Sequence, residues 1–260
     1  MPRQVFWGKD VPETAREVTM DIARICAACD HTLLKVDCTF DQIRELADEA
    51  IQYHAASICI PPAYTRMAAE YLHGRMPITN VIGFPNGYMT TAAKVFEAEN
   101  AIEEGASEID MVINVGYVKS GLWDDVEKDI AAVREATGGH ILKVIIECCL
   151  LTDEEKIRLC KIVTDTGCDF IKTSTGFSTH GATFADVKLL RANVGSTVRV
   201  KAAGGIHTLE DAEKFLDLGA SRLGTSNIIK EVMRMQHVGD FLQTNANIDR
   251  NFDQFMKTQA

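Results

Sequence analysis

The feature that most constrains the fold is a regular alternation of short apolar segments with amphipathic segments along almost the whole chain. Each apolar segment has the length and composition of a buried strand, and each amphipathic segment has helical periodicity. Strict alternation of this kind predicts parallel strands joined by right-handed helical crossovers. The expected strands cover residues 29–33, 56–60, 78–84, 108–114, 141–147, 168–172, 197–202 and 221–224, and the expected helices cover residues 41–53, 61–72, 91–104, 123–136, 152–166, 183–192, 208–218 and a last helix from about 226.

Eight such units in about 200 residues favour an α/β fold of the (β/α)8 or TIM-barrel type. An open doubly wound sheet is the alternative, and the lack of a GxGxxG motif after the first strand counts against it. We expect a single barrel domain over residues 1–260. It would carry an N-terminal extension over residues 1–25, with a helical piece from Pro12, and a polar C-terminal tail over residues 236–260.

The charge balance limits the classes of partner. The chain has 27 Lys and Arg against 37 Asp and Glu, a net charge of −10, which argues against nucleic acid or an anionic membrane as the main partner. No apolar run approaches the roughly 18 residues of a membrane helix, and the N-terminus is too polar for a signal peptide. We therefore expect a cytoplasmic protein whose eight cysteines are reduced thiols. We also expect a homo-oligomer, a dimer or a tetramer.

The parity of the expected strands predicts which side chains face the barrel interior. Alternate residues of a barrel strand face the interior and the helix layer. Apolar positions such as Ile109 and Met111 form the outer set, so their polar neighbours face inward. By this parity the interior receives Asp110, Lys143, Lys172 and Lys201 from four consecutive strands, together with Glu147 and Arg199.

The stretch DFIKTSTGF, residues 169–177, is the centre of this polar interior. Lys172 ends a buried strand and is followed by a loop of hydroxyl residues and glycine. A buried ammonium costs several kcal/mol unless it is paired, whereas a buried lysine with a neutral amine is a nucleophile that forms Schiff bases. This position therefore predicts a nucleophilic lysine.

The plainer interpretation is an ion-pair network that only fixes strand register, and it fits Lys143 with Asp110. It fits Lys172 and Lys201 less well, because two neighbouring ammonium groups repel and we expect one carboxylate to be unable to pair with three of them. Repulsion then favours the neutral amine in one of these two lysines.

Glycines mark the ends of three expected strands. Gly204 and Gly205 follow the seventh strand, Gly224 and Ser226 follow the eighth, and Gly176 follows the sixth. Glycine lets backbone N–H groups approach an anion, and the loops after strands seven and eight are the usual phosphate site of a TIM barrel. A phosphate site is expected here, while glycines needed only for tight turns are the alternative.

Together these residues predict an enzyme that forms an imine with a carbonyl substrate carrying a phosphate. No cluster of His, Asp or Glu has metal-ligand spacing, so neither a metal nor another cofactor is expected, and the expected partners are sugar phosphates and aldehydes. One alternative is another lysine-dependent aldolase or a transaldolase with a larger donor. A second alternative, from a different class, is a catalytically silent sugar-phosphate-binding barrel.

The motifs of this chain resemble those of the deoxyribose-phosphate aldolase family of class I aldolases. The resemblance extends over most of residues 29–227 and is most specific in DFIKTSTGF and KAAGGI. It implies a (β/α)8 barrel that reversibly cleaves 2-deoxy-D-ribose 5-phosphate to acetaldehyde and D-glyceraldehyde 3-phosphate in deoxyribonucleoside breakdown. The matching stretches are DHTLLK (30–35), ASICIPP (56–62), VIGFPNG (81–87), EIDMVINVG (108–116), LKVIIE (142–147), DFIKTSTGF (169–177) and KAAGGI (201–206).

The resemblance also implies residue roles. Lys172 matches the Schiff-base lysine, Lys201 the lysine that lowers its pKa and helps to move protons, and Asp110 the acid/base carboxylate, while Lys143 matches a lysine that contacts the substrate or the proton relay. The substrate and its phosphate are expected at Cys59, Thr175, Gly176, Gly204, Gly205, Gly224 and Ser226. Two positions depart from the family: His207 stands where many members have arginine, and the chain ends in KTQA where some end in a tyrosine that reaches the site.

Overall fold

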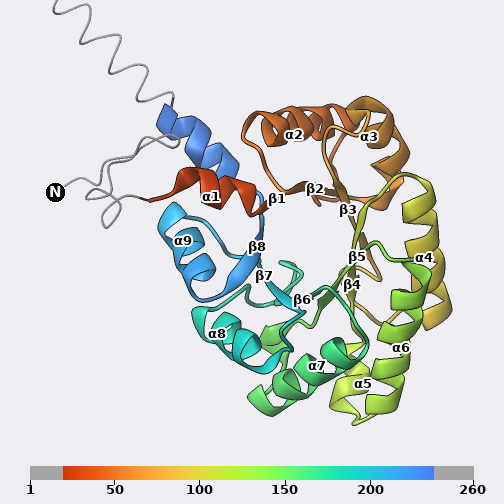
Figure 1. Cartoon of the computed structure of the whole chain (residues 1–260). Coiled ribbons are helices and arrows are strands. Elements are labelled where there is room, and N and C mark those ends of the chain that lie inside the picture. Colours follow the sequence, from red (N-terminus) through yellow and green to blue (C-terminus); the bar gives the residue numbers. More distant parts are fainter. Residues whose placement is uncertain (1–19, 237–260) are drawn as a thin grey trace, which may run out of the picture.

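The computed structural model describes residues 20–236, and their strands close into one parallel barrel. Each strand pairs with the next along the chain, and the eighth pairs with the first (Figure 1). The barrel prediction is confirmed and the open sheet is wrong. The strands are β1 (Cys29–Thr32), β2 (Ser57–Ile60), β3 (Ile78–Ile82), β4 (Glu108–Val112), β5 (Ile141–Ile145), β6 (Phe170–Lys172), β7 (Arg199–Ala203) and β8 (Ala220–Thr225).

The helices form the outer layer around this barrel (Figure 1). Residues 228–236 are also helical, and they follow β8. The described α-helices are α1 (Ile22–Ala27), α2 (Phe40–Gln52), α3 (Thr65–Leu72), α4 (Thr91–Glu103), α5 (Val115–Lys119), α6 (Trp123–Ala136), α7 (Asp153–Asp165), α8 (Phe184–Asn193) and α9 (Leu209–Asp217), and the short 3-10 helices are η2 (Pro62–Tyr64) and η3 (Cys148–Leu150).

Local sequence signals explain where most of these helices begin. Thr152 caps α7 in a capping box with Glu155, as its spacing predicts. Two elements were not predicted, α5 and η3, because segments of five and three residues are too short to show helical periodicity. The prolines after β2 were expected to open a long helix, but they form the 3-10 turn η2 and the α-helix starts at Thr65.

The helical piece expected from Pro12 lies almost entirely outside the described residues, as does the tail from residue 237. Within the described part, α1 buries Ile22 and Ile25 and packs against α9 (Figure 1). In residues 20–236 no helix is long and apolar enough to cross a bilayer. Cytoplasmic localisation stays a prediction.

The predicted inward and outward parity of the strands is confirmed. Ile109 and Met111 are fully buried in the apolar layer between barrel and helices. The parallel register places Asp110 opposite Lys143 and Lys172 opposite Lys201, so four polar residues meet inside the barrel. Closing the barrel therefore builds the site.

Candidate active site

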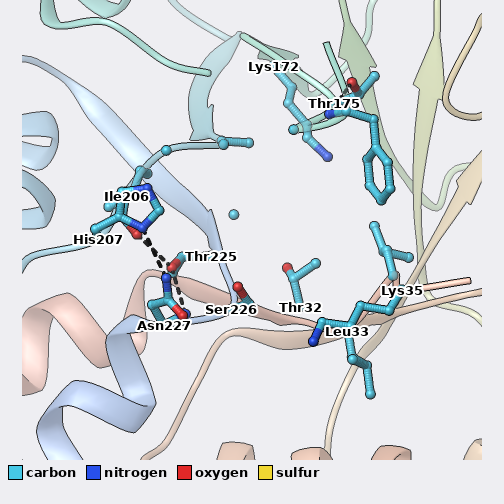
Figure 2. Close-up of a pocket in the computed structure, with 17 residues that line it drawn as sticks. Thr32, Leu33, Lys35, Lys172, Thr175, Ile206, His207, Thr225, Ser226 and Asn227 are labelled. Carbon is cyan, nitrogen blue, oxygen red and sulfur yellow. Dashed lines mark hydrogen bonds between the residues drawn. The ribbon is translucent and has the colours of Figure 1, made fainter. Parts of the chain in front are cut away.

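Lys172 brings an amine to the carboxyl end of the barrel. It is the last residue of β6, its side chain is only 4% exposed, and its amine points into a cavity (Figure 2). Its Nζ lies 2.7 Å from Oδ2 of Asp110 on β4. The side chain is thus held at its tip by one carboxylate while remaining accessible to a molecule in the cavity.

Asp110 binds all three interior lysines. Its Oδ1 accepts from Lys143 at 2.8 Å, and its Oδ2 accepts from both Lys172 and Lys201 at 2.7 Å. The expectation that one carboxylate could not pair with three ammonium groups is wrong. A carboxylate offers about four lone-pair sites, and here further carboxylates share the positive charge.

Three further charged groups belong to the cluster and were not assigned to the site by sequence reasoning: the carboxylates of Asp30 and Glu108 and the guanidinium of Arg222. Asp30, on β1, accepts hydrogen bonds from Lys201 and from Arg222. Glu108, on β4, lies 2.6 Å from Nζ of Lys143 and 3.2 Å from the Arg222 guanidinium. Strand parity could have identified Glu108 and Arg222, because residues two apart on a strand face the same side. Glu108 lies two residues before Asp110, and Arg222 lies two residues before Gly224.

The electrostatic environment distinguishes Lys172 from Lys201. Burial lowers the pKa of Lys172; Asp110 opposes this, and the positive charge of Lys201 adds to it. Burial acts in the same direction on Lys201, but the negative charges of Asp110 and Asp30 outweigh it and raise the pKa of that lysine. Lys201 is therefore an ammonium, and Lys172 is the lysine driven toward a neutral amine. Burial lowers the pKa of Lys172 more than repulsion by Lys201 does.

Asp110 is held in its ionised form. Burial alone would raise its pKa, but Lys143, Lys172 and Lys201 together hold the pKa of this carboxyl well below its usual range. The Asp110 carboxylate and the Lys201 ammonium thus lie next to each other, beside the Lys172 amine. They form a proton acceptor and a proton donor at hydrogen-bond distance from each other.

A cavity of about 300 Å³ lies next to this cluster, and six of the seven predicted binding residues line it. The exception is Cys59, which is buried on β2, 1% exposed, and does not line the cavity. Burial raises the pKa of its thiol. The six lining residues are Thr175, Gly176, Gly204, Gly205, Gly224 and Ser226.

The glycines at the cavity wall have a conformational requirement as well. Gly176 and Gly204 have φ of +85° and +79°, which other residues rarely adopt. A Cβ on Gly204 would lie 3.1 Å from the Cα atoms of Gly176 and Gly181, so the loops after β6 and β7 pack backbone against backbone. The backbone conformation and close packing of these two loops therefore require glycine at both positions.

His207 and Asn227 lie at one end of the cavity, away from the Lys172 amine (Figure 2). The Nδ2 of Asn227 lies 3.0 Å from Nδ1 of His207. When Nδ1 accepts this hydrogen bond, the imidazole keeps its proton on Nε2, which becomes a donor. Thr32, Leu33 and Lys35 also line the cavity and were not predicted.

Glu147 was predicted to face inward but received no role. Its carboxylate accepts from the hydroxyl of Thr175 at 2.5 Å and from the backbone N–H of Thr175 at 3.3 Å. Its own φ of +57° is unfavourable for a residue with a side chain. Glu147 therefore fixes the first part of the loop that follows Lys172.

The fold and the site define a TIM-barrel enzyme with a buried lysine whose amine opens into a cavity of small-molecule size. A family model for "DeoC/LacD family aldolase" matches residues 24–226. The chain belongs to this family. It is 58% identical over 213 residues to deoxyribose-phosphate aldolases of Streptococcus agalactiae and Streptococcus pyogenes, covering 82% of this chain and 96% of each relative.

Two solved structures show the same barrel. A structure from Coccidioides immitis is 42% identical, with a TM-score of 0.79 over 82% of this chain and 87% of that one. The deoxyribose phosphate aldolase of Aeropyrum pernix, described as having a unique tetrameric structure, is 29% identical with a TM-score of 0.77 over 84% and 93% of the two chains.

Proposed function

We propose that this chain is a class I aldolase that reversibly cleaves 2-deoxy-D-ribose 5-phosphate to acetaldehyde and D-glyceraldehyde 3-phosphate, in deoxyribonucleoside catabolism. The observation that carries the proposal is the Lys172 amine, which opens into the cavity beside Asp110 and Lys201. The relatives at 58% identity, which bear this activity in their names, support it.

The cycle begins with attack of the neutral Lys172 amine on the open-chain aldehyde. Protonation of the resulting carbinolamine hydroxyl and loss of water give an iminium whose positive nitrogen accepts electrons. A base removes the proton from the hydroxyl on carbon 3, the bond between carbons 2 and 3 breaks, and its electrons form a neutral enamine. D-Glyceraldehyde 3-phosphate leaves, carbon 2 is protonated, and water releases acetaldehyde from Lys172.

The protonation states of the cluster suggest how the protons move. Asp110, held as a carboxylate, can accept a proton directly or through water, and Lys201, held as an ammonium, can donate one. Lys143 contacts Oδ1 of Asp110, the oxygen that Lys172 does not contact, and keeps the carboxylate in place. We assign Lys172, Lys201, Asp110 and Lys143 to the chemistry on this basis.

The opposite end of the cavity is assigned to the phosphate. The glycine loops after β6, β7 and β8 meet there, with Ser226, Asn227 and His207 supplying polar side chains. The Thr175 hydroxyl, oriented by Glu147, lines the cavity nearer to Lys172 (Figure 2). Cys59 remains a candidate only for shaping the buried wall behind the lysines, since it does not line the cavity. Neither a metal nor a cofactor has a role in this cycle.

The test is reduction of the trapped imine. Wild-type protein treated with acetaldehyde and borohydride should carry one label, on Lys172, while Lys172→Met should carry none and should be inactive. Label on Lys143 or Lys201 would contradict the assignment. Binding of substrate with no label at all would favour a silent sugar-phosphate-binding barrel, and turnover with dihydroxyacetone rather than acetaldehyde as donor would favour a transaldolase-type enzyme.

We also propose a homo-oligomer, a dimer or a tetramer, and a cytoplasmic location. The tetrameric description of the Aeropyrum pernix enzyme supports the first. Analytical ultracentrifugation of the full chain tests it, and a monomer at micromolar concentration would contradict it.

A further inference from the structure

Seven charged side chains inside the barrel form one network of ion pairs with a nearly even charge balance; Glu147, which hydrogen-bonds to Thr175, and Arg199, which is exposed, are not part of this network. Within residues 20–236, the carboxylates of Asp30, Glu108 and Asp110 meet the cations of Lys143, Lys172, Lys201 and Arg222. Six of these groups pair three negative charges with three positive ones, so one cation is in surplus when all four are charged. A low-dielectric interior disfavours such a surplus.

The contacts indicate which cation is the surplus one. Lys201 pairs with two carboxylates, Asp30 and Asp110. Lys143 lies within 4.0 Å of three, at 2.6, 2.8 and 3.7 Å. Arg222 pairs with two and has no accessible neutral form. Among residues 20–236, the only carboxylate that pairs with Lys172 is Asp110.

Lys172 is also the lysine of this set that lines the cavity, so a proton leaving it can reach solvent or substrate. It is therefore the group whose loss of a proton brings the interior to neutrality. Its lowered pKa agrees with this view.

We propose that Arg222, held by Asp30 and Glu108, is a positioning residue that keeps Lys172 neutral by completing the charge balance of the barrel interior. The proposal rests on the proposed function, in which Lys172 must be an amine to attack the substrate. Arg222 lies on β8 and does not line the cavity, so it acts without touching the substrate. Its fixed charge makes it suited to this role, because it cannot itself release the proton.

The groups that face this cluster come from every strand of the barrel. Besides the seven charges, Ser57 on β2 donates to Asp30, and Thr79 on β3 donates to Glu108. The buried Cys59 thiol has its pKa raised by burial and stays uncharged near neutral pH. The ring of Phe170 on β6 faces the Arg222 guanidinium at 5.5 Å. None of these neutral groups can replace the charge of Arg222.

The sign of the effect follows from the balance. Removal of the Arg222 charge leaves three carboxylates with two fixed cations, and a protonated Lys172 restores neutrality. Arg222→Met should therefore raise the pKa of Lys172 and move the acid limb of the kcat/KM profile to higher pH. Glu108→Gln removes a negative charge and should move the acid limb to lower pH. A charge about 10 Å away at an effective dielectric constant of about 20 changes a protonation equilibrium on the order of tenfold.

The matched control is Arg222→Lys, which keeps the charge and loses the guanidinium geometry. Its acid limb should remain at the wild-type position even if the protein is less stable or slower. The readout is the pH dependence of two quantities, kcat/KM and the rate of imine trapping at Lys172 by acetaldehyde and borohydride followed by peptide mapping. The second quantity reports the state of the amine separately from turnover. Circular dichroism and gel filtration confirm that each variant is folded.

Opposite displacements in Arg222→Met and Glu108→Gln, with no displacement in Arg222→Lys, would support the inference, because general loss of structure moves both variants in one direction. If wild type is labelled at Lys172 but all three variants keep the wild-type acid limb, the inference is wrong and the proposed function stands. Failure of wild type to form the imine would remove the proposed function itself. If Arg222→Met does not fold, Glu108→Gln is sufficient as a test. An acid limb of Glu108→Gln that stays at the wild-type pH, or moves to higher pH, would overturn the inference.

Discussion

Substitution of Lys201 by leucine tests the electrostatic argument at its centre. Leucine suits a buried position and removes one positive charge beside the nucleophile. Lys172 and Lys201 each lie 2.7 Å from the same oxygen of Asp110, so their two nitrogens are at most about 5.4 Å apart, twice that distance. At this separation, and at an effective dielectric constant of about 20, their repulsion is worth about 3 kcal/mol.

This repulsion translates into a rate. Removing about 3 kcal/mol of repulsion stabilises the Lys172 ammonium on the order of a hundredfold relative to the amine. At any pH below the pKa of Lys172, turnover by Lys201→Leu should fall by the same factor. The loss should shrink as the pH rises toward 9, where Lys172 deprotonates without help. Full recovery is not expected, because Lys201 also serves as a proton donor.

The assay is a pH–rate profile of both proteins between pH 6 and 9, with imine trapping in parallel. Asp30 keeps Arg222 as a partner and Asp110 keeps two lysines, so we expect a folded but less stable protein. Unfolding by urea measures the loss, for which breaking a buried ion pair suggests about 3–5 kcal/mol. A mutant profile parallel to wild type across the whole range would refute the view that Lys201 controls the nucleophile.

Three further predictions concern the rest of the site. Activity should survive exhaustive chelation with EDTA, because the iminium replaces a metal as electron acceptor; loss of activity with recovery on addition of zinc would exclude a class I mechanism. His207→Ala should lower kcat/KM for deoxyribose 5-phosphate about tenfold, the worth of one hydrogen bond to a charged group, and leave that for unphosphorylated deoxyribose unchanged; an equal loss on both substrates would place His207 outside the phosphate site. The free energy of unfolding should fall as the pH drops below about 4, because Asp30 and Asp110 have folded-state pKa values below the unfolded-state value. Such groups stabilise the fold at pH values above the unfolded-state pKa and lose that effect as they become protonated. Urea titrations at several pH values should show a flatter pH dependence for Asp110→Asn, and a slope as steep as in wild type would contradict the assignment.

The sequence alone was enough to predict the fold and the lysines. Periodicity identifies the strands and helices because a buried parallel strand and an amphipathic helix have different repeats. Parity then places Asp110, Lys143, Lys172 and Lys201 inside the barrel, and the structure brings all four together. These inferences need only local pattern, which is why they succeeded.

What the sequence did not reveal depends on contacts across the whole barrel. Asp30 and Arg222 are separated by 192 residues, and only the pairing of β8 with β1 makes them neighbours. Glu147 was expected to face inward as part of a strand, but β5 ends at Ile145, and the hydrogen bonds of Glu147 to Thr175 depend on an unusual backbone angle that no local rule predicts. The error about Asp110 has the same origin, because the number of partners of a carboxylate is a property of the assembled interior.

The charge balance of the interior also bears on the step after imine formation. The iminium at Lys172 carries the same positive charge as the ammonium, so the surplus that disfavours the ammonium also destabilises the iminium. Breaking the bond between carbons 2 and 3 removes that charge, since the electrons flow to nitrogen and form a neutral enamine. An interior that is neutral only when Lys172 is uncharged therefore favours both the attacking amine and the cleavage product. For this reason loss of either fixed cation, Lys201 or Arg222, should slow carbon–carbon cleavage even at high pH, where the amine is already free. Single-turnover measurements at pH 9 would show this as slower release of D-glyceraldehyde 3-phosphate after normal imine formation, and an unchanged cleavage rate would show that the balance affects only the nucleophile.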